Sequence, residues 1–443
     1  MARRYPLTKK LSWRFEYLGY RLMEAFLRLI PLSWIDQIGS AVGFLFFYLS
    51  PRYRRLAVRN LRIAFGEEEQ KTAQDIRLLA RQTCQRTIAN FLGTLKTTIL
   101  PTSKVSEHIE FSGLEILNNT LQKGKGAILV LGHMGNWEAL NRLHQFLPPD
   151  TPAGGIYQPL KNPLVNAHLL KGREQDGSRF FNKRDGFHAP ASFIKNGGLL
   201  IVVADQKVGK AGTPIPFFNR LSTLSPLPAL LARKAGAPVV AAGIEAISPG
   251  KWRVVFKEIG EQPKTSKIIN TLEELIRRSP ADYLWLHNRW KLHTRTSLSI
   301  SARKGKSTTQ KTKPLRALLL STQPIDIVEL QAYLNSREPT DLPLEFETLI
   351  ATNEPQNLPN NKLFPTSQII APTSEQLAAR IKEIDENKLS NPLEIALILQ
   401  PNSSLTQGAK LAQLPTIKTN TKNLSLQDFL NSLTASTTPP LNS

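Results

Sequence analysis

Two residues in one short segment have the types and spacing needed for acid–base chemistry. His133 and Glu138 stand five positions apart in residues 126–140, GAILVLGHMGNWEAL. The apolar run 127–131, bounded by glycines, predicts a buried strand. The turn after it leads into residues 137–147, which have helical character. His133 is therefore expected at the carboxyl end of a strand and Glu138 at the start of a helix, a common position for active residues in open α/β sheets.

The chemistry that this pair suggests is general-base catalysis. If the Glu138 carboxylate folds back onto the imidazole, it fixes the tautomer of His133 and stabilises the imidazolium that forms when His133 takes a proton. The arrangement is the base half of a hydrolytic triad without its serine, so the nucleophile is expected to be a substrate hydroxyl. The competing interpretation, a structural histidine near a glutamate, is not excluded by the spacing.

Further segments predict the sheet that holds these residues. The run 198–204 indicates a second buried strand that delivers Asp205 and Gln206 to the same sheet edge. Asp205 is then either a cap or a substrate-positioning group. Residues 226–244 have the pattern of a helix, a turn and a strand, which is typical of a mostly parallel sheet. Phe217, Phe218 and residues 221–231 either line an apolar groove or pack in the core.

Composition narrows the class of partner. The chain has 443 residues, with 57 Lys and Arg against 35 Asp and Glu, and a net charge of +22. The first 300 residues hold 43 of these basic residues and 22 of the acidic ones, so the excess lies there. Such a balance favours polyanions: nucleic acid, an anionic membrane or an acidic carrier. No nucleic-acid-binding motif is present, which disfavours the first. With a single cysteine, Cys84, the chain cannot form an internal disulfide. Cys84 is predicted to be an ordinary residue of a helix.

The N-terminal segment is predicted to associate with a membrane. Apolar residues recur at helical spacing from Leu11 to Ile30 with arginines between them, which indicates a basic amphipathic helix ending at Pro31. The charge-free run that follows, residues 37–51, is shorter than the roughly 20 residues of a spanning helix. These helices either pack on the core or dock on an anionic bilayer, and the arginine cluster in residues 52–62 favours docking. A tilted single span stays open.

Several separate motifs together carry a family resemblance. In order along residues 10–295, the chain resembles the late acyltransferases of lipid A biosynthesis, a family related to the lysophospholipid acyltransferases. The segments that carry the resemblance are RNLRIAFGEEE (59–69), GHMGNWEAL (132–140), YQPLKNPLVN (157–166), VADQ (203–206), PFFNRLS (216–222), ARKAGAPVV (232–240) and DYLWLHNRWK (282–291).

The resemblance implies direct acyl transfer from an acyl-thioester, usually acyl carrier protein and otherwise coenzyme A, to a lipid hydroxyl. It implies that His133 and Glu138 carry catalysis and that Arg173 is the matching arginine, with Arg179 close by. His133 would deprotonate the acceptor hydroxyl. Turn amides or Arg173 would stabilise the oxyanion, unless Arg173 binds a phosphate. The other residues expected to contact substrate are Asp205, Asn136 and Arg289.

The same resemblance sets expectations about partners and location. The expected partners are an acidic acyl carrier protein, an anionic phosphorylated glycolipid and a membrane surface, with no nucleic acid. No metal or other cofactor is expected, and His287 lacks the paired His or Asp motif of a metal site. The enzyme is expected at the cytoplasmic face of a bacterial inner membrane, peripheral or with one span.

The predicted fold class is α/β with more than one domain. Residues 1–298 are expected to form an acyltransferase domain, a mostly parallel mixed sheet flanked by helices with N-terminal membrane-associated helices. A Ser/Thr/Lys-rich linker at 299–315 would lead to an accessory domain at 316–434, with a disordered tail at 435–443. Strand-like and helical runs alternate in the accessory domain and predict a small Rossmann-like unit. It has no glycine-rich phosphate loop, so no nucleotide site is assigned.

Overall fold

A computed structural model gives the structure, and its described residues form two compact units. The first unit takes in residues up to Val58, Arg77–Gln206 and Leu224–His287; the second takes in Arg59–Ile76, Lys207–Thr223 and the residues from Asn288 onward. Two segments from within the expected acyltransferase domain therefore belong to the second unit. Most of the expected linker and all of the expected tail lie outside the described residues. The described residues are 6–67, 71–174, 176–208, 212–290, 312–337, 343–356, 358, 363–418 and 426–434.

The first unit is built on a seven-stranded, mostly parallel sheet, as the sequence predicted. The strand order is β1-β9-β8-β2-β5-β3-β4, and β8 and β9 form its antiparallel pair among the described residues. The two predicted strands appear as β2 and β5, which are direct parallel neighbours. Their carboxyl ends therefore meet at one edge. The strands are β1 (Ile109–Ser112), β2 (Ala127–Leu131), β3 (Ala153–Tyr157), β4 (Arg179–Asn182), β5 (Leu199–Val203), β8 (Pro238–Ser248) and β9 (Lys251–Glu261).

Helices cover both faces of this sheet because its strands are apolar on both sides. Alternate residues of β8, such as Val240 and Ala242, face a core cluster that includes Leu117 and Leu121 of α6. Gly243, the residue after Ala242, faces Leu275 of α10 on the other side of the sheet. The helical elements around the sheet are α5 (Thr102–Ser106), α6 (Leu114–Gln122), η1 (Trp137–Phe146), α7 (Pro163–Glu174), η2 (Lys183–Asp185), α8 (His188–Lys195), α9 (Leu227–Ala235), α10 (Thr265–Arg278) and η3 (Pro280–Asp282).

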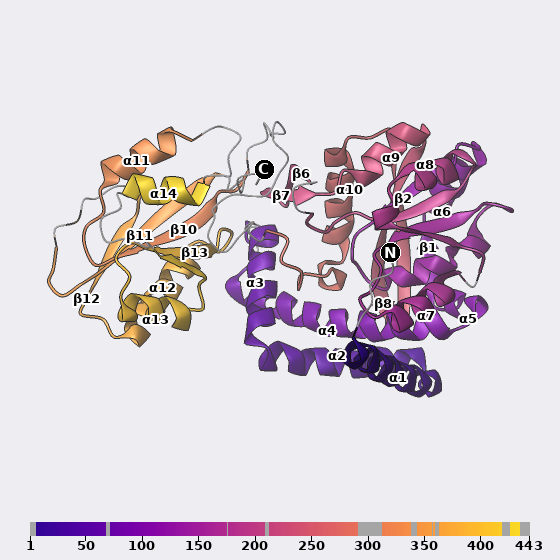
Figure 1. The fold of residues 1–443 in the computed structure, drawn as a ribbon, viewed down its shortest axis with the longest axis horizontal. Coiled ribbons are helices and arrows are strands. Elements are labelled where there is room, and N and C mark those ends of the chain that lie inside the picture. Colours follow the sequence, from indigo (N-terminus) through magenta and orange to yellow (C-terminus); the bar gives the residue numbers. More distant parts are fainter. Residues whose placement is uncertain are drawn as a thin grey trace. The chain divides into compact units, whose positions relative to one another are not determined.

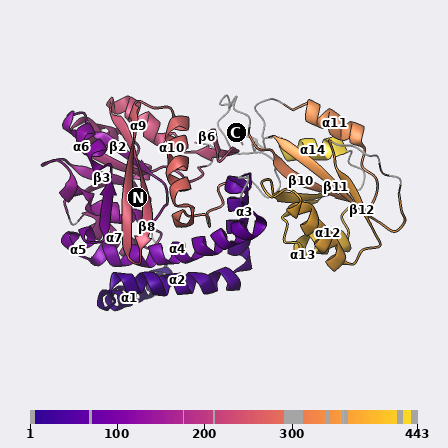
Figure 2. The same cartoon turned by 180° about the vertical axis from the view of Figure 1, so that it is seen from behind.

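Three N-terminal helices lie together along one side of the first unit (Figures 1 and 2): α1 (Leu7–Leu29), α2 (Leu32–Leu49) and α4 (Ala73–Ile99). Between α2 and α4 in sequence comes α3 (Pro51–Phe65), which stands at their end. Two glycines let α2 lie directly on α4. An added Cβ at Gly39 or Gly43 would come within 2.6 Å or 2.4 Å of the α4 backbone. The pairing of α2 with α4 therefore depends on small residues at this contact.

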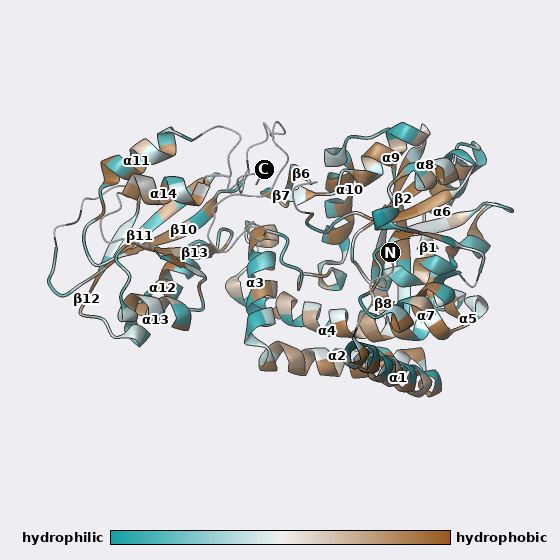
Figure 3. Ribbon diagram, in the orientation of Figure 1, coloured by the Kyte–Doolittle hydropathy of each residue, from teal (hydrophilic) through white to brown (hydrophobic). Residues whose placement is uncertain are grey.

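The apolar stripe of α1 is exposed. Phe15, Leu22 and Phe26 are 72%, 64% and 62% exposed, while Glu24 on another face of the helix is 4% exposed. The sequence-based alternative in which this stripe packs on the core is therefore wrong for α1. The adjoining α2 is apolar along most of its length (Figure 3) and is long and apolar enough to cross a membrane, although a core helix or a signal sequence meets the same criterion.

The second unit contains a five-stranded, all-parallel sheet in the order β12-β11-β10-β13-β14. Numbered along the chain, this is the order 3-2-1-4-5, so the chain starts in the middle and winds outward in both directions. Alternate residues of β10 face two clusters: Ala317 and Leu319 pack with α11 and α14, and Leu318 and Leu320 pack with α12 and α13. The predicted alternation of strands and helices is confirmed. The elements are β6 (Thr213–Phe217), β7 (Arg220–Leu224), β10 (Leu315–Ser321), α11 (Ile327–Asn335), β11 (Leu344–Thr352), β12 (Thr366–Ile370), α12 (Ser374–Glu386), β13 (Leu393–Ile398), α13 (Ser403–Leu411), β14 (Thr416–Lys418) and α14 (Leu426–Thr434).

Arginines from the two early segments hold this second sheet. Arg59 donates from Nε to Glu394 at 2.7 Å, and Arg220 is ion-paired with the other oxygen of the same carboxylate. Arg62 donates to carbonyls near the carboxyl end of α12, including that of Asp385 at 2.6 Å. These carbonyls lack partners within the helix, so the guanidinium caps them. The C-terminal residues are therefore joined to α3 and the β6–β7 hairpin by buried charge.

Candidate active site

The turn after β2 places His133 at the carboxyl edge of the sheet. The Met134 amide donates to the Gly132 carbonyl at 2.8 Å, which closes the turn tightly. Gly135 has φ of +57°, and an added Cβ would lie 2.5 Å from the Ile244 carbonyl oxygen. Only glycine fits there without strain. The chain can thus reverse directly under β8 and hold His133 in a fixed position.

His133 is paired with Asp205, the residue delivered by the neighbouring strand. The His133 Nδ1 atom lies 2.6 Å from one Asp205 carboxylate oxygen. The other oxygen accepts the His133 backbone N–H at 3.1 Å and the Tyr283 hydroxyl at 2.8 Å. Asp205 is fully buried, and the His133 side chain is 15% exposed. A buried carboxylate needs such donors to offset its lost hydration, so this set of bonds fixes both side chains.

The second ring nitrogen of His133 has a partner of its own. The Gln206 side-chain nitrogen lies 3.0 Å from His133 Nε2. With Nδ1–H donating to Asp205, Nε2 carries a lone pair and accepts from this amide. Both contacts therefore specify one tautomer, the one in which Nε2 is the basic atom. A substrate hydroxyl would have to replace the Gln206 amide to reach it.

The expected pairing of His133 with Glu138 does not form. Glu138 accepts instead from Arg173, whose Nε and Nη2 lie 2.9 Å and 2.6 Å from its two oxygens, and from Asn141 at 2.8 Å. The physical reason is that a bidentate guanidinium satisfies both carboxylate oxygens at once. Arg173 also lies over the Phe180 ring, 5.8 Å from its centroid. Glu138 and Arg173, both of which the family resemblance singled out, thus pair with each other. His133 pairs with Asp205 instead.

Two other residues expected to contact substrate are buried. Asn136 is 1% exposed; its side chain accepts from Thr94 at 2.9 Å and donates to Thr97 at 3.1 Å. It holds α4 to the turn. Arg289 belongs to the second unit, is fully buried and lies over the Phe217 ring at 5.5 Å. The contact of these two residues with substrate stays a prediction.

Phe217 and Phe218, which were expected either in an apolar groove or in the core, lie in the core. Phe217 and Phe218 are 0% and 1% exposed, and Phe218 packs against Phe65 with ring centroids 5.5 Å apart. Cys84 is likewise fully buried on α4, and burial raises the pKa of its thiol to about 11. A neutral buried thiol is a poor nucleophile. The prediction of a plain helix residue agrees with this.

A buried ionic network, which the sequence analysis did not predict, supports the turn. Asp282 accepts the Gly135 amide on its backbone carbonyl at 3.0 Å, and its carboxylate accepts from Arg86 Nε at 3.1 Å. Arg86 is also bonded to both oxygens of Asp36, at 3.1 and 3.0 Å. Burial opposes the charge on Arg86, but the two carboxylates together raise its pKa above its ordinary value. The members come from α2, α4 and η3, so no local spacing could have revealed them.

The hydrogen bonds of the turn limit which backbone amides are available to stabilise an oxyanion. Those of Met134 and Gly135 already donate to Gly132 and Asp282. The amides of residues 136–138, at the start of η1, remain as candidates for the predicted role. Trp137 lies beside the base, with its ring centroid 5.1 Å from that of His133. The described residues hold no group of three or more His, Cys, Asp and Glu that would suit a metal ion.

The sheet edge defines the class of protein. A histidine base held by a buried aspartate, with no serine nucleophile beside it, suits transfer of a group to a hydroxyl that the substrate supplies. Residues 6–292 match the sequence model of the bacterial lipid A biosynthesis acyltransferases. This is well over half of the chain, and the chain therefore belongs to that family.

Relatives of known activity are similar over the same region. The chain is 22% identical to a lipid A biosynthesis lauroyltransferase of Escherichia coli strain K12, over 59% of this chain and 87% of that protein. It is 23% identical to the palmitoleoyltransferase of the same pathway and organism, over 59% and 86%. A lipid A biosynthesis acyltransferase of Haemophilus influenzae is 22% identical over 62% and 89%. The similarity leaves most of the C-terminal residues uncovered.

Proposed function

We propose that this protein transfers a fatty acyl chain from an acyl-thioester, most simply acyl carrier protein, to a hydroxyl of a lipid A precursor. The observation that carries the proposal is the His133–Asp205 pair at the sheet edge. The first 300 residues have 21 more basic than acidic residues, which suits an acidic carrier and a phosphorylated acceptor. Coenzyme A thioester remains the alternative donor.

In the proposed reaction, His133 Nε2 takes the proton of the acceptor hydroxyl as its oxygen attacks the thioester carbonyl. Amides of residues 136–138, or Arg173, stabilise the oxyanion. The carbon–sulfur bond then breaks, and the departing thiolate receives the proton from the imidazolium. An ester and a free thiol result, with no acyl-enzyme. Asp205 stabilises the imidazolium throughout, and Glu138 holds Arg173 in place. These steps use only side chains and backbone amides of the chain.

The location that we propose is the cytoplasmic face of a bacterial inner membrane. The exposed apolar stripe of α1 and the apolar helix α2 would enter the bilayer, and the arginines of residues 52–62 that remain accessible would meet anionic headgroups. For the C-terminal sheet we propose a Rossmann-like domain with an accessory role, because its 3-2-1-4-5 order is that of one doubly wound family of folds.

The test is mass spectrometry of the lipid A fraction from cells with and without this protein. We expect the protein to add one acyl chain, whose mass gives its length, and we expect His133→Ala to abolish the addition while folding and membrane binding persist. Full activity of His133→Ala would disprove the mechanism. Addition of the chain to a lysophospholipid or another glycolipid would change the acceptor. Absence of any addition by the wild-type protein would favour a non-catalytic membrane protein.

A further inference from the structure

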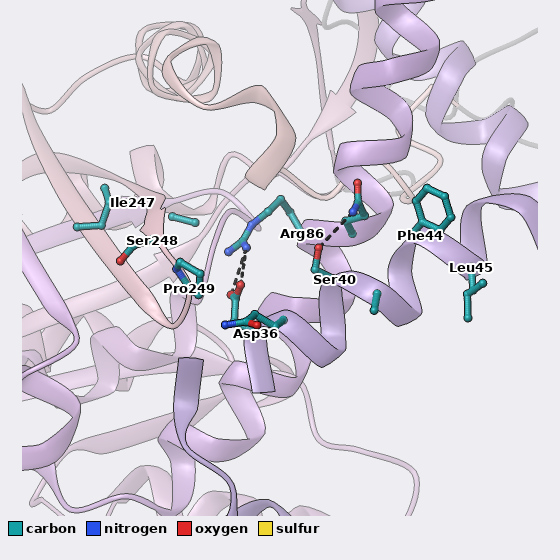
Figure 4. Close-up of a pocket in the computed structure, with 12 residues that line it drawn as sticks. Asp36, Ser40, Phe44, Leu45, Arg86, Ile247, Ser248 and Pro249 are labelled. Atoms are coloured by element: carbon teal, nitrogen blue, oxygen red, sulfur yellow. Dashed lines mark hydrogen bonds and ion pairs between the residues drawn. The ribbon is translucent and has the colours of Figure 1, made fainter. Parts of the chain in front are cut away.

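A groove in the first unit lies between the apolar helix α2 and the body of the protein. Its volume is about 800 Å³, and three parts of the chain line it: one face of α2, two residues of α4, and the end of β8 with the residue that follows it. The close-up shows Phe44 and Leu45 at one end, the Asp36–Arg86 pair in the middle, and Ile247, Ser248 and Pro249 at the other end (Figure 4). Phe44 and Leu45 are 39% and 56% exposed, so the apolar end is open.

The groove is at the same edge of the sheet as His133. β8 runs parallel to β2, so its last residues lie beyond the carboxyl edge at which His133 and Asp205 stand. Residues 246–249, at that end of β8, line the groove. Asp282 connects the two places directly: it accepts from Arg86 in the groove and from Gly135 in the catalytic turn. A molecule in the groove therefore lies against the framework that holds the base.

The lining changes from polar to apolar along α2. Asp36, Ser40 and Phe44 follow each other at intervals of four residues, so they lie on one helix face. The lining residues of α2 extend from 36 to 45, which is about 13 Å along the helix. At the polar end, Gln85 donates to the Ser40 hydroxyl at 3.2 Å. This bond leaves the hydroxyl hydrogen of Ser40 and the amide oxygen of Gln85 to bind a ligand.

The charges of the groove select against phosphate. Three nitrogens of Arg86 are already bonded, to Asp36, Asp282 and Asn90. The Arg86, Asp36 and Asp282 group carries one more negative than positive charge. A phosphate at this polar end would meet repulsion, because the guanidinium nitrogens of Arg86 already have partners. Another cation, Arg81, lies over the Phe44 ring at the apolar end, 5.6 Å from its centroid. An uncharged group with a hydroxyl or an amide meets Ser40 and Gln85 instead, and a hydrocarbon chain meets Ala41, Phe44 and Leu45.

We propose that this groove binds an acyl chain of the acceptor lipid, with the hydroxyl- or amide-bearing end of that chain at Ser40 and Gln85. The groove opens along α2, whose other exposed residues, among them Ile38 and Val42, suit the bilayer interior. A chain that already belongs to a membrane lipid can enter from that side, whereas a donor chain arrives on a carrier from solution. The identity of the acceptor rests on the proposed function; the groove and its polarity do not.

The first test is photo-crosslinking in the full-length protein made inactive by His133→Ala. Benzoylphenylalanine is introduced at Phe44 in the groove or at Val42, which lies 200° further round the helix, and the probe is a lipid A precursor in phosphatidylglycerol vesicles. We expect at least 10-fold more precursor adduct from position 44 than from position 42, with phosphatidylglycerol adducts at position 42. Equal labelling of both positions by both lipids would show only general bilayer contact and would overturn the proposal.

The second test fills the groove. Ala41→Trp places an indole among the lining residues, whereas Val42→Trp, its matched control, places one on the outer face. In the otherwise wild-type protein we expect Ala41→Trp to raise KM for the acceptor about 10-fold, with kcat and the donor KM within 2-fold, because the lost binding is equal in the ground state and the transition state. An unchanged acceptor KM in Ala41→Trp would refute the groove. If no acyl transfer occurs at all, the proposed function fails, and the crosslinking result still decides on the groove.

Discussion

The two units of this protein each contain a network of buried charges, and the networks differ in one respect. At the sheet edge of the first unit, a buried carboxylate pairs with a histidine, His133, which is 15% exposed. In the second unit, buried carboxylates pair with arginines: Arg220 and Glu394 are 4% and 7% exposed. Histidine gains and loses a proton near neutral pH, whereas arginine stays protonated. In the proposed mechanism, the same kind of buried carboxylate therefore supports proton transfer in one unit and only holds segments together in the other.

The two networks also differ in their position relative to the family match. The His133–Asp205 pair lies within residues 6–292, the part that matches the family. The arginine network joins residues of that part, such as Arg59 and Arg220, to Glu394 in the C-terminal sheet. The C-terminal sheet is thus a structural partner for α3 and the β6–β7 hairpin, although the sequence suggested a separate domain behind a linker. Asp205→Asn and Tyr283→Phe alter the first network, and Glu394→Leu alters the second.

The largest effect is expected from Asp205→Asn. The amide has the size of the carboxylate but donates a hydrogen bond toward Nδ1, so it favours the tautomer in which Nε2 carries the proton and cannot act as a base. We expect kcat to fall by about 10³- to 10⁴-fold at neutral pH, as when an Asp–His pair loses its charge in other enzymes. Nitrogen-15 spectra of labelled histidines, with the His133 signal assigned by its loss in His133→Ala, should show the changed tautomer.

The matched control for that variant is Glu138→Gln. It removes the charge that faces Arg173 and leaves the Asp205 bond to His133 in place, so the tautomer signal of His133 should not change. We expect its activity to fall through loss of Arg173 positioning, and the pH profile of kcat/KM to keep its shape. If Glu138→Gln changed the His133 tautomer and Asp205→Asn did not, the roles of the two carboxylates would have to be exchanged.

The next largest effect is expected from Glu394→Leu in the second unit. The substitution leaves Arg59 and Arg220 buried without the carboxylate that they share, which typically costs about 3–5 kcal/mol in the free energy of unfolding. Urea titration measures this loss. Glu274→Leu is the control, because the Lys257–Glu274 pair is about half exposed, and its loss should cost at most about 1 kcal/mol. Similar losses for both variants would show that the buried network does not stabilise the unit.

Much of this architecture was predictable because it depends on local patterns. The apolar runs 127–131 and 198–204 predicted β2 and β5, and the position of Asp205 after the second run predicted that it would reach the same edge as His133. The alternation of strands and helices after residue 316 was predicted for the same reason. Periodicity and length are properties of a short segment, so they can be recognised without knowing its neighbours.

The partner of each charged side chain was not predictable in the same way. Glu138 is five residues from His133, and Asp205 is 72 residues away, yet the more distant carboxylate forms the pair. Tertiary packing decides which carboxylate pairs with His133. The strands β2 and β5 are adjacent, and Glu138 is bound by Arg173 on α7. The same applies to Arg289, whose motif gave no sign that it would be buried. Sequence spacing indicates which residues share an edge, and side-chain packing decides which of them bond.

Tyr283→Phe should have a smaller effect on the same site. It removes one donor to Asp205 and keeps the buried ring, so the loss is that of one hydrogen bond to a charged group, about 1.5–3 kcal/mol. If half or more of this loss falls on the transition state, kcat/KM drops about 4- to 160-fold, between the effects of Asp205→Asn and the wild type. An activity equal to the wild type would mean that the His133 contacts alone position Asp205.

The smallest effect at neutral pH is expected at Cys84, where burial shifts a titration without any charged partner. Its folded pKa is about 11, raised from an ordinary value of 9.0 by burial. The thiol binds its proton more tightly in the folded state, so its contribution to stability is complete below pH 9 and is lost as the pH rises from 9 toward 11. We expect the difference in unfolding free energy between the wild type and Cys84→Ala to be constant below pH 9 and to change by about 2–3 kcal/mol by pH 11, to the disadvantage of the wild type. Groups common to both proteins cancel in this difference. A pH-independent difference would mean that the thiol is hydrated in the folded state, and with it the close packing of α2 on α4 would be in question.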